Sequence, residues 1–216
     1  MIEHTDVTIL GTTTLKNKLG ITDPQQLATA EADFTAFRLA ELRIAPIPGG
    51  FDSVHLQEIH HHVYQDLYDW AGELRRVDAC SPPASDVATS LNDVLDRLAR
   101  ENHLKGRSPE EWSHSVSAYI YDLGTIQPFL TGNEVALREF ADELARKNNL
   151  SLQWDLAPEF GTSDPIRHLD QSEQSANIRR VVMLAMDTCP SSFRPSRGAV
   201  AERGIERLFS AGTPLP

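Results

Sequence analysis

The sequence predicts an all-α protein, a helical bundle with one short β-hairpin. Most of its 216 residues repeat their apolar side chains every three or four positions, the spacing that gives a helix one buried face. An Asp or Ser stands directly before Pro24 and Pro109, a typical signal for a helix start. Only residues 73–79 resemble strand material, and Pro82-Pro83 follows them closely.

Two helices are expected in the first third of the chain. Asp23 can accept a hydrogen bond at the start of the first helix, which should continue until the Pro- and Gly-rich residues 46–50 break it. The second should end near residues 70–72. Its apolar face consists of Leu56, Ile59, Val63 and Leu67.

Further helices are expected across the rest of the chain. One is marked by an apolar face from Val87 to Leu98. Ser108 and Glu111 form a capping box before a helix of about residues 113–125, which should lie antiparallel to one of about residues 133–147. Apolar patterns predict two more helices at residues 178–186 and 199–209. We expect a domain over residues 1–190 and a C-terminal tail over residues 191–216, with a short helix in the tail.

Charge and composition disfavour several classes of protein. The formal net charge is −11, so the surface should repel nucleic-acid phosphates and anionic lipids, and neither partner is expected. No run of about 18 apolar residues occurs that could span a bilayer. The N-terminus lacks the features of a signal peptide. The two cysteines lack metal-ligand spacing, and a reduced cytoplasm is the simplest location.

The most informative stretch of the chain is residues 127–138, which read QPFLTGNEVALR. A loop that leads into a helix near Gly132-Asn133 would offer free backbone N–H groups and the positive end of a helix dipole. Such an arrangement is a ready binding site for phosphate groups. The bland alternative for the same two residues is a simple turn and helix cap.

This stretch resembles the active-site motif of the Fic family, His-Pro-Phe-x-Asp/Glu-Gly-Asn-Gly-Arg-x-x-Arg. Residues 14–21, 51–60 and 65–75 resemble other parts of Fic domains, in the order that the family shows. The resemblance covers roughly residues 12–150 and implies a Fic-like helical bundle with a hairpin flap. It also implies a protein adenylyltransferase, which moves AMP from ATP to a hydroxyl group of a target protein with the help of Mg²⁺.

The motif departs from the family pattern at four positions. Gln127 stands where the family has a histidine, and glutamine cannot act as the general base at neutral pH. Thr131 replaces the carboxylate that holds the metal, and Val135 replaces the first arginine. Glu134 replaces the second glycine and places a negative charge where phosphate oxygens would approach. Together these changes argue against ordinary adenylylation.

The candidate site follows from these positions. The resemblance assigns Gln127, as a degenerate base position, and Arg138 to the catalytic set. Thr131 marks a degenerate metal position at which no metal is expected. No cofactor is expected, with ATP and Mg²⁺ as the ones required if activity is retained. The nucleotide-binding set consists of Gly132, Asn133, Glu134 and Val135.

Two neighbouring groups of residues have simpler interpretations. His55 and the run His60–His62 resemble metal ligands, but successive helical residues point about 100° apart, so we interpret them as surface or groove histidines. Arg75 and its neighbours are interpreted as solvated charges of the flap. Because Pro82-Pro83 follows so soon, the flap is short for the family, and docking of a target by strand pairing should be lost or altered. The family's inhibitory signature, Ser/Thr-x-x-x-Glu-Gly/Asn, does not occur.

Three functions remain open. The first is a pseudoenzyme that binds a partner protein or a nucleotide. The second is a residually active or re-purposed nucleotidyltransferase, which the retained Gly132, Asn133 and Arg138 favour. The third is a component of a toxin–antitoxin type system, in which a small antitoxin-like protein would be the partner. Nucleotide binding and transfer of label to protein distinguish them.

Overall fold

The computed structural model describes residues 7–78, 82–152 and 154 of the chain. Within these residues the fold is all-α, as predicted, and contains no strand beyond an isolated bridge between Thr8 and Leu15. Short 3₁₀ turns, η2 (Ala84–Asp86) and η3 (Asn102–Leu104), flank the third of five helices. The helices are α1 (Pro24–Ile44), α2 (Ser53–Tyr64), α3 (Val87–Arg100), α4 (Pro109–Ile126) and α5 (Asn133–Lys147).

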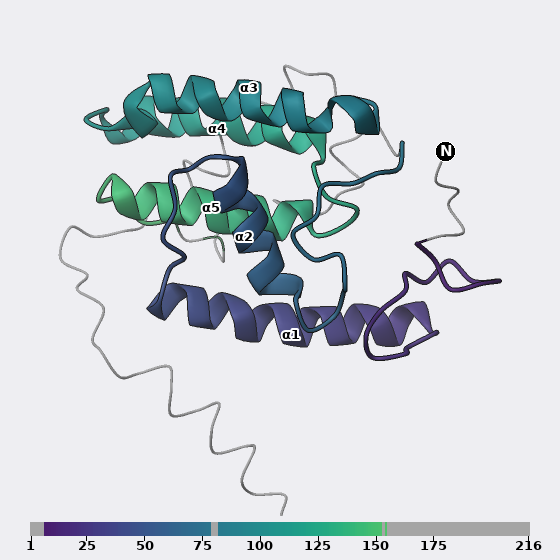
Figure 1. The fold of residues 1–216 in the computed structure, drawn as a ribbon. Coiled ribbons are helices and arrows are strands. Elements are labelled where there is room, and N and C mark those ends of the chain that lie inside the picture. The colour runs from purple at the N-terminus through teal and green to yellow at the C-terminus, as the bar shows by residue number, and fades with distance from the viewer. Residues whose placement is uncertain (1–6, 79–81, 153, 155–216) are drawn as a thin grey trace, which may run out of the picture.

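The helices form layers around α2 and α5 (Figure 1). Helix α2 packs against α1 on one side and α5 on the other, and α4 packs against both α5 and α3. The buried core takes aromatic and aliphatic side chains from all of these helices and from the segments between them. Its largest fully buried members include Trp112, Tyr68, Phe129, Leu42, Leu56, Ile59, Leu91 and Leu144.

Both predicted helix starts are confirmed. The Asp23 carboxylate accepts a hydrogen bond from the backbone N–H of Gln26 at 2.8 Å, with Pro24 at the first helical position of α1. At the start of α4 the capping box is complete. The Glu111 N–H donates to the Ser108 hydroxyl at 3.3 Å, and the Ser108 N–H donates to the Glu111 carboxylate at 2.9 Å. These caps satisfy backbone groups that a helix leaves without intrahelical partners.

The second helix is shorter than predicted, because α2 ends at Tyr64 and not near residues 70–72. After Tyr64 the chain turns back along α2. The Gly72 N–H donates to the Nδ1 atom of His60 at 2.9 Å, and the Ala71 carbonyl lies 2.9 Å from Nδ1 of His61. A continued helix would have carried Ala71 and Gly72 away from these partners. Gly72 adopts a φ of +85°, which favours glycine at this turn.

The predicted hairpin is not formed in residues 73–78, none of which is a strand, and its expected tip at 79–81 lies outside the described residues. The Arg75 N–H instead donates to the Pro128 carbonyl at 2.8 Å. The helices predicted at 178–186 and 199–209, and the domain boundary near 190, also lie outside the described residues. Among the residues that the structure describes, no helix is both long and apolar enough to cross a bilayer.

Candidate functional site

The motif loop, defined as residues 127–133, joins the end of α4 to the start of α5. Gln127 ends α4 in the left-handed region with a φ of +46°, and its N–H still donates to the Leu123 carbonyl. Asn133 closes the loop on itself. Its side-chain oxygen accepts from the Phe129 N–H at 2.8 Å, and its amide nitrogen donates to the Phe129 carbonyl at 2.9 Å. The spacing Phe-x-x-x-Asn of the motif therefore maintains the shape of the loop.

Both the backbone conformation and a neighbouring side chain require a glycine at position 132. It has a φ of +72°, and a Cβ atom there would lie 2.3 Å from Cε2 and 2.4 Å from Cζ of Tyr64. Tyr64 belongs to the end of α2 and is buried. Its ring covers the glycine, so the first turn of α5 can approach α2 only if position 132 has no side chain.

His60 fixes the other end of the loop. Its side chain is fully buried, and its ring is stacked on Phe129 at a centroid distance of 3.8 Å. Because Nδ1 accepts from the Gly72 N–H, Nε2 carries the proton and donates to the Thr131 carbonyl at 3.1 Å. Burial lowers the pKa of His60 to about 4, so the ring is neutral at physiological pH. His60 is thus a structural group, and the expectation of a surface or groove histidine is wrong.

His55 is also buried, which corrects the same expectation for a second histidine. Its Nδ1 accepts from the Phe51 N–H at 3.3 Å, and its Nε2 lies 2.9 Å from a carboxylate oxygen of Glu143 on α5. The pair links α2 to α5 inside the core. His61 is exposed and His62 is only partly buried, and His62 lies 3.2 Å from the carboxylate of Glu41. The histidines therefore do not converge on one point, as helical geometry predicts.

Arg75 is a buried residue of this region whose contacts the sequence did not reveal. It was expected to be a solvated flap charge, but only 4% of its surface is exposed. Its guanidinium donates to the carbonyls of Gln127 at 2.8 Å, Val77 at 2.9 Å and Pro82 at 2.5 Å. A further contact of 3.3 Å reaches the carbonyl of Ile126 at the end of α4. An arginine beside a second arginine in a polar segment gives no signal of burial.

The retained motif arginine is paired with one of the replaced positions. The guanidinium of Arg138 lies 3.2 Å from the carboxylate of Glu134, one helical turn earlier on α5. The Arg138 guanidinium also lies over the ring of Trp154, 5.4 Å from its centroid. Burial raises the pKa of Glu134 and lowers that of Arg138, while the charge of each partner opposes the shift of the other. The first turn of α5 thus already holds a carboxylate near its positive end.

The remaining motif positions do not suit Mg²⁺ or a triphosphate. Val135 packs against the core, and the Thr131 carbonyl is hydrogen-bonded to His60. Within the described ranges, no group of three or more His, Cys, Asp or Glu side chains is placed to hold a metal ion. Mg²⁺ prefers carboxylate oxygens, and Glu134 is engaged by Arg138. That no cofactor binds stays a prediction.

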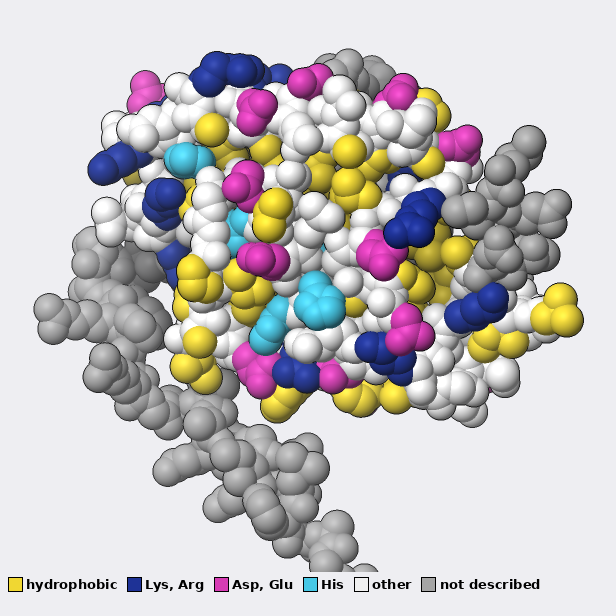
Figure 2. All heavy atoms as spheres, viewed as in Figure 1, with side chains coloured by type: hydrophobic (Ala, Val, Ile, Leu, Met, Phe, Trp, Pro, Cys, Tyr) yellow, Lys and Arg dark blue, Asp and Glu magenta, His cyan; other side chains and the backbone are white. Residues whose placement is uncertain are grey.

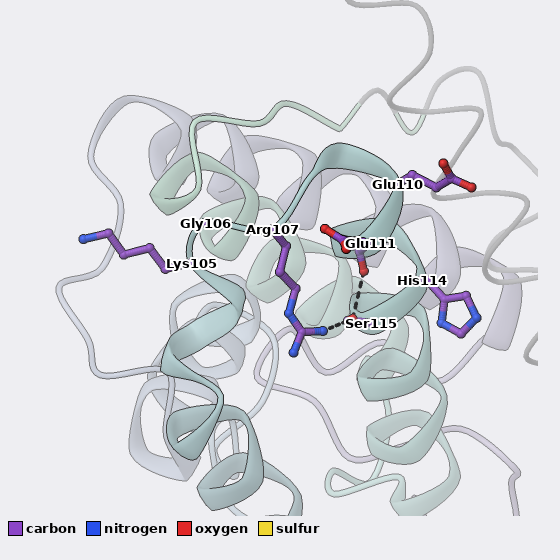
Figure 3. A pocket seen from close by; sticks show the side chains of 7 residues that line it. All are labelled: Lys105, Gly106, Arg107, Glu110, Glu111, His114 and Ser115. Carbon is purple, nitrogen blue, oxygen red and sulfur yellow. Dashed lines mark hydrogen bonds between the residues drawn. The ribbon is translucent and has the colours of Figure 1, made fainter.

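A surface hollow lies elsewhere, at the opposite end of α4 from the motif loop (Figure 3). Its polar groups bond to one another: Arg107 donates to the Ser115 hydroxyl, which donates to the Glu111 carbonyl at 2.8 Å. The side chain of Glu111 is held by the capping box. We interpret the hollow as the outer side of this helix start, because Arg107, Glu111 and Ser115 already have partners. It is lined by Lys105, Gly106, Arg107, Glu110, Glu111, His114 and Ser115.

Comparison with known proteins gives a consistent result. The Fic/DOC family model matches residues 50–145. The protein adenylyltransferase VbhT of Bartonella schoenbuchensis is 35% identical over 144 residues, which cover 64% of this chain but only 30% of VbhT. The probable protein adenylyltransferase Fic of Salmonella typhimurium is 32% identical over 149 residues, which cover 67% of this chain and 74% of that protein.

Solved structures agree with the sequence comparison. The N-terminal Fic domain of a putative cell filamentation protein of Bartonella quintana, solved with bound ADP, matches with a TM-score of 0.75 and 25% identity. The match covers 86% of this chain and 95% of that structure. The Fic domain of Bep8 from Bartonella sp. 1-1C gives the same TM-score at 22% identity, and so supports the fold alone. The sequence blocks, the all-α fold and the coverage of the Salmonella relative lead to one conclusion: the chain belongs to the Fic/DOC family.

Proposed function

We propose that this chain is a catalytically impaired Fic protein, which keeps the fold and the motif loop of adenylyltransferases and acts by binding a partner protein. The observation that carries the proposal is the ion pair of 3.2 Å between Arg138 and Glu134. In the family pattern the position of Glu134 is a glycine, which leaves the arginine available for phosphate charge. Here a carboxylate of the chain itself neutralises that arginine.

Each chemical requirement of adenylyl transfer is weakened separately. Without a histidine at position 127, general-base assistance worth about 10²–10⁴ in rate is missing. Thr131 supplies no negative charge for Mg²⁺, and Val135 supplies no positive charge for the phosphate of the transferred adenylyl group. Binding a triphosphate would require breaking the Arg138–Glu134 pair in a partly buried environment and would leave Glu134 facing the phosphates.

The structural parts of the motif are retained, and this supports a binding role. Asn133 closes the loop, Gly132 fits beneath Tyr64, and His60 holds the Thr131 carbonyl. Fic adenylyltransferases act on proteins, so a protein partner, such as a small antitoxin-like protein in the cytoplasm, fits the family. On the face in Figure 2 acidic and basic side chains are interspersed, without a broad basic patch that would suit nucleic acid.

The test is transfer of label from α-labelled ATP to proteins of a cell lysate. The unmodified chain should label nothing above background, and Gln127→His alone should not rescue transfer. The combination Gln127→His, Thr131→Asp, Glu134→Gly and Val135→Arg should rescue some labelling, because it restores the base, the metal ligand and the freed Arg138. Adding Arg138→Ala to this combination is the matched control and should abolish the rescued signal.

Nucleotide binding provides an independent measurement. Calorimetry of the unmodified chain with ATP and Mg²⁺ should give dissociation constants of about a millimolar or weaker, or about −4 kcal/mol at best. Glu134→Gly alone should strengthen binding, since it removes the competing carboxylate. Micromolar binding by the unmodified chain, or labelling that Arg138→Ala abolishes, would support the alternative of a residually active nucleotidyltransferase.

A further inference from the structure

We infer that Arg75 is the positioning residue of the motif loop, and that it holds this loop against Val77 and Pro82. This inference concerns how the loop is held and stands whether or not the chain transfers adenylyl groups. It follows from the number, direction and chemical type of the contacts that Arg75 makes.

The contacts of Arg75 join two parts of the chain that are distant in sequence. On one side are Val77 and Pro82, whose carbonyls accept from the two terminal guanidinium nitrogens. On the other side, the carbonyls of Ile126 and Gln127 accept from the guanidinium. The Arg75 backbone N–H adds a hydrogen bond of 2.8 Å to the Pro128 carbonyl. Both the main chain and the side chain of Arg75 therefore bond to residues 126–128.

The position of the guanidinium matches the electrostatics of the end of α4. The last carbonyls of a helix have no intrahelical donors and form the negative end of the helix dipole. Arg75 supplies a positive charge and donors to these carbonyls. Among the described residues, no carboxylate lies within ion-pair distance of Arg75, so main-chain carbonyls are the partners that offset its burial.

Arg75 acts on the loop at a different point from His60. His60 holds the Thr131 carbonyl, near the start of α5. Arg75 holds residues 126–128, where Gln127 adopts the left-handed conformation that ends α4 and turns the chain into the loop. The planar guanidinium reaches several acceptors at fixed angles, which a lysine ammonium cannot reproduce. The loop should therefore respond to loss of Arg75 even where a positive charge is kept.

The experiment is amide hydrogen exchange of the full chain, compared with Arg75→Lys and Arg75→Ala. The reporting amides are those of residue 75, Gln127 and Phe129, which bond to Pro128, Leu123 and Asn133 respectively. In both variants these amides should exchange at least about tenfold faster, while amides in the middle of α5 keep their protection. Arg76→Lys is the matched control, since Arg76 is exposed and its one bond within the described ranges is to Glu73, and it should change nothing.

A rescue step separates positioning from simple packing. Arg75→Ala leaves main-chain carbonyls without their donors, so low concentrations of guanidinium chloride, well below those that denature, should slow loop exchange again. Sodium chloride at equal concentration should not. Equal loss of protection in the loop and in α5, unchanged loop exchange in Arg75→Lys, or absence of guanidinium rescue would each overturn the inference. None of these readouts depends on ATP or labelling, so they leave the proposed function to its own tests.

Discussion

Replacing Gly132 by alanine would create a steric clash between the new methyl group and the ring of Tyr64. The new Cβ would lie 2.3 Å from Cε2, 2.4 Å from Cζ and 2.6 Å from the hydroxyl oxygen. The φ of +72° adds a backbone cost of about 1–2 kcal/mol for an L-residue. Forcing Tyr64 out of the way adds roughly 1–3 kcal/mol, the usual range for overpacking. The free energy of unfolding should therefore fall by about 2–5 kcal/mol.

Gly106→Ala is the matched control. Gly106 has a φ of +83°, but nothing lies within 4 Å of the Cβ that alanine would add, so this variant reports the backbone cost alone. For a chain of this size each kcal/mol lowers Tm by about 2–4 °C. We expect a Tm decrease of roughly 4–20 °C for Gly132→Ala and no more than about 2–8 °C for Gly106→Ala, measured by circular dichroism.

A double-mutant cycle with Tyr64→Ala identifies the cause. If the ring is the obstacle, Gly132→Ala should destabilise the Tyr64→Ala variant by only about 1–2 kcal/mol, which is the backbone part. Equal effects of Gly132→Ala in both backgrounds, or equal Tm shifts for Gly132→Ala and Gly106→Ala, would refute the packing of Tyr64 on Gly132.

Two predictions concern pH. The pKa of His60 is about 4 in the folded chain and 6.5 in the unfolded one. Its contribution to stability is therefore complete above pH 6.5 and is lost as the pH is lowered towards 4. Urea titrations should show the unmodified chain losing about 2–3 kcal/mol more than His60→Gln between pH 6.5 and 4.5, and parallel curves would contradict this. Burial and then Glu139 raise the pKa of Asp142 to about 7, so the cost of ionising it appears as pH rises from 4 to 7. Asp142→Asn, which keeps an acceptor for the Trp154 N–H, should stabilise the protein by roughly 4 kcal/mol at pH 8 and little at pH 4, and a pH-independent effect would count against it.

Local sequence signals predicted the helices well. Asp23-Pro24 and the Ser108–Glu111 box mark starts that the structure places at the same residues, because a cap is made by atoms only three residues apart. The spacing of the motif likewise located the loop and the start of α5. The end of α2 was predicted too late, because the turn after Tyr64 is stabilised by contacts of Ala71 and Gly72 with His61 and His60 of α2.

The motif residues of the candidate site could be named from the sequence, but the residues that hold the motif loop in place could not. Which motif positions had changed could be read directly, and the structure adds that Glu134 and Arg138, four residues apart on α5, are paired. The roles of His60 and Arg75 could not be predicted. Their partners lie about 50 to 70 residues further along the chain, at Thr131 and at Gln127.

By itself, then, the sequence determined the fold class, the helix starts, the family resemblance and the departures from the family motif at positions 127, 131, 134 and 135. These depend on residue type and on short, periodic spacings. Only the tertiary structure decided which polar residues are buried and what they bond to. A histidine on α2 and an arginine after it became the anchors of the motif loop, since burial and hydrogen-bond partners are set by elements that meet only when the chain has folded.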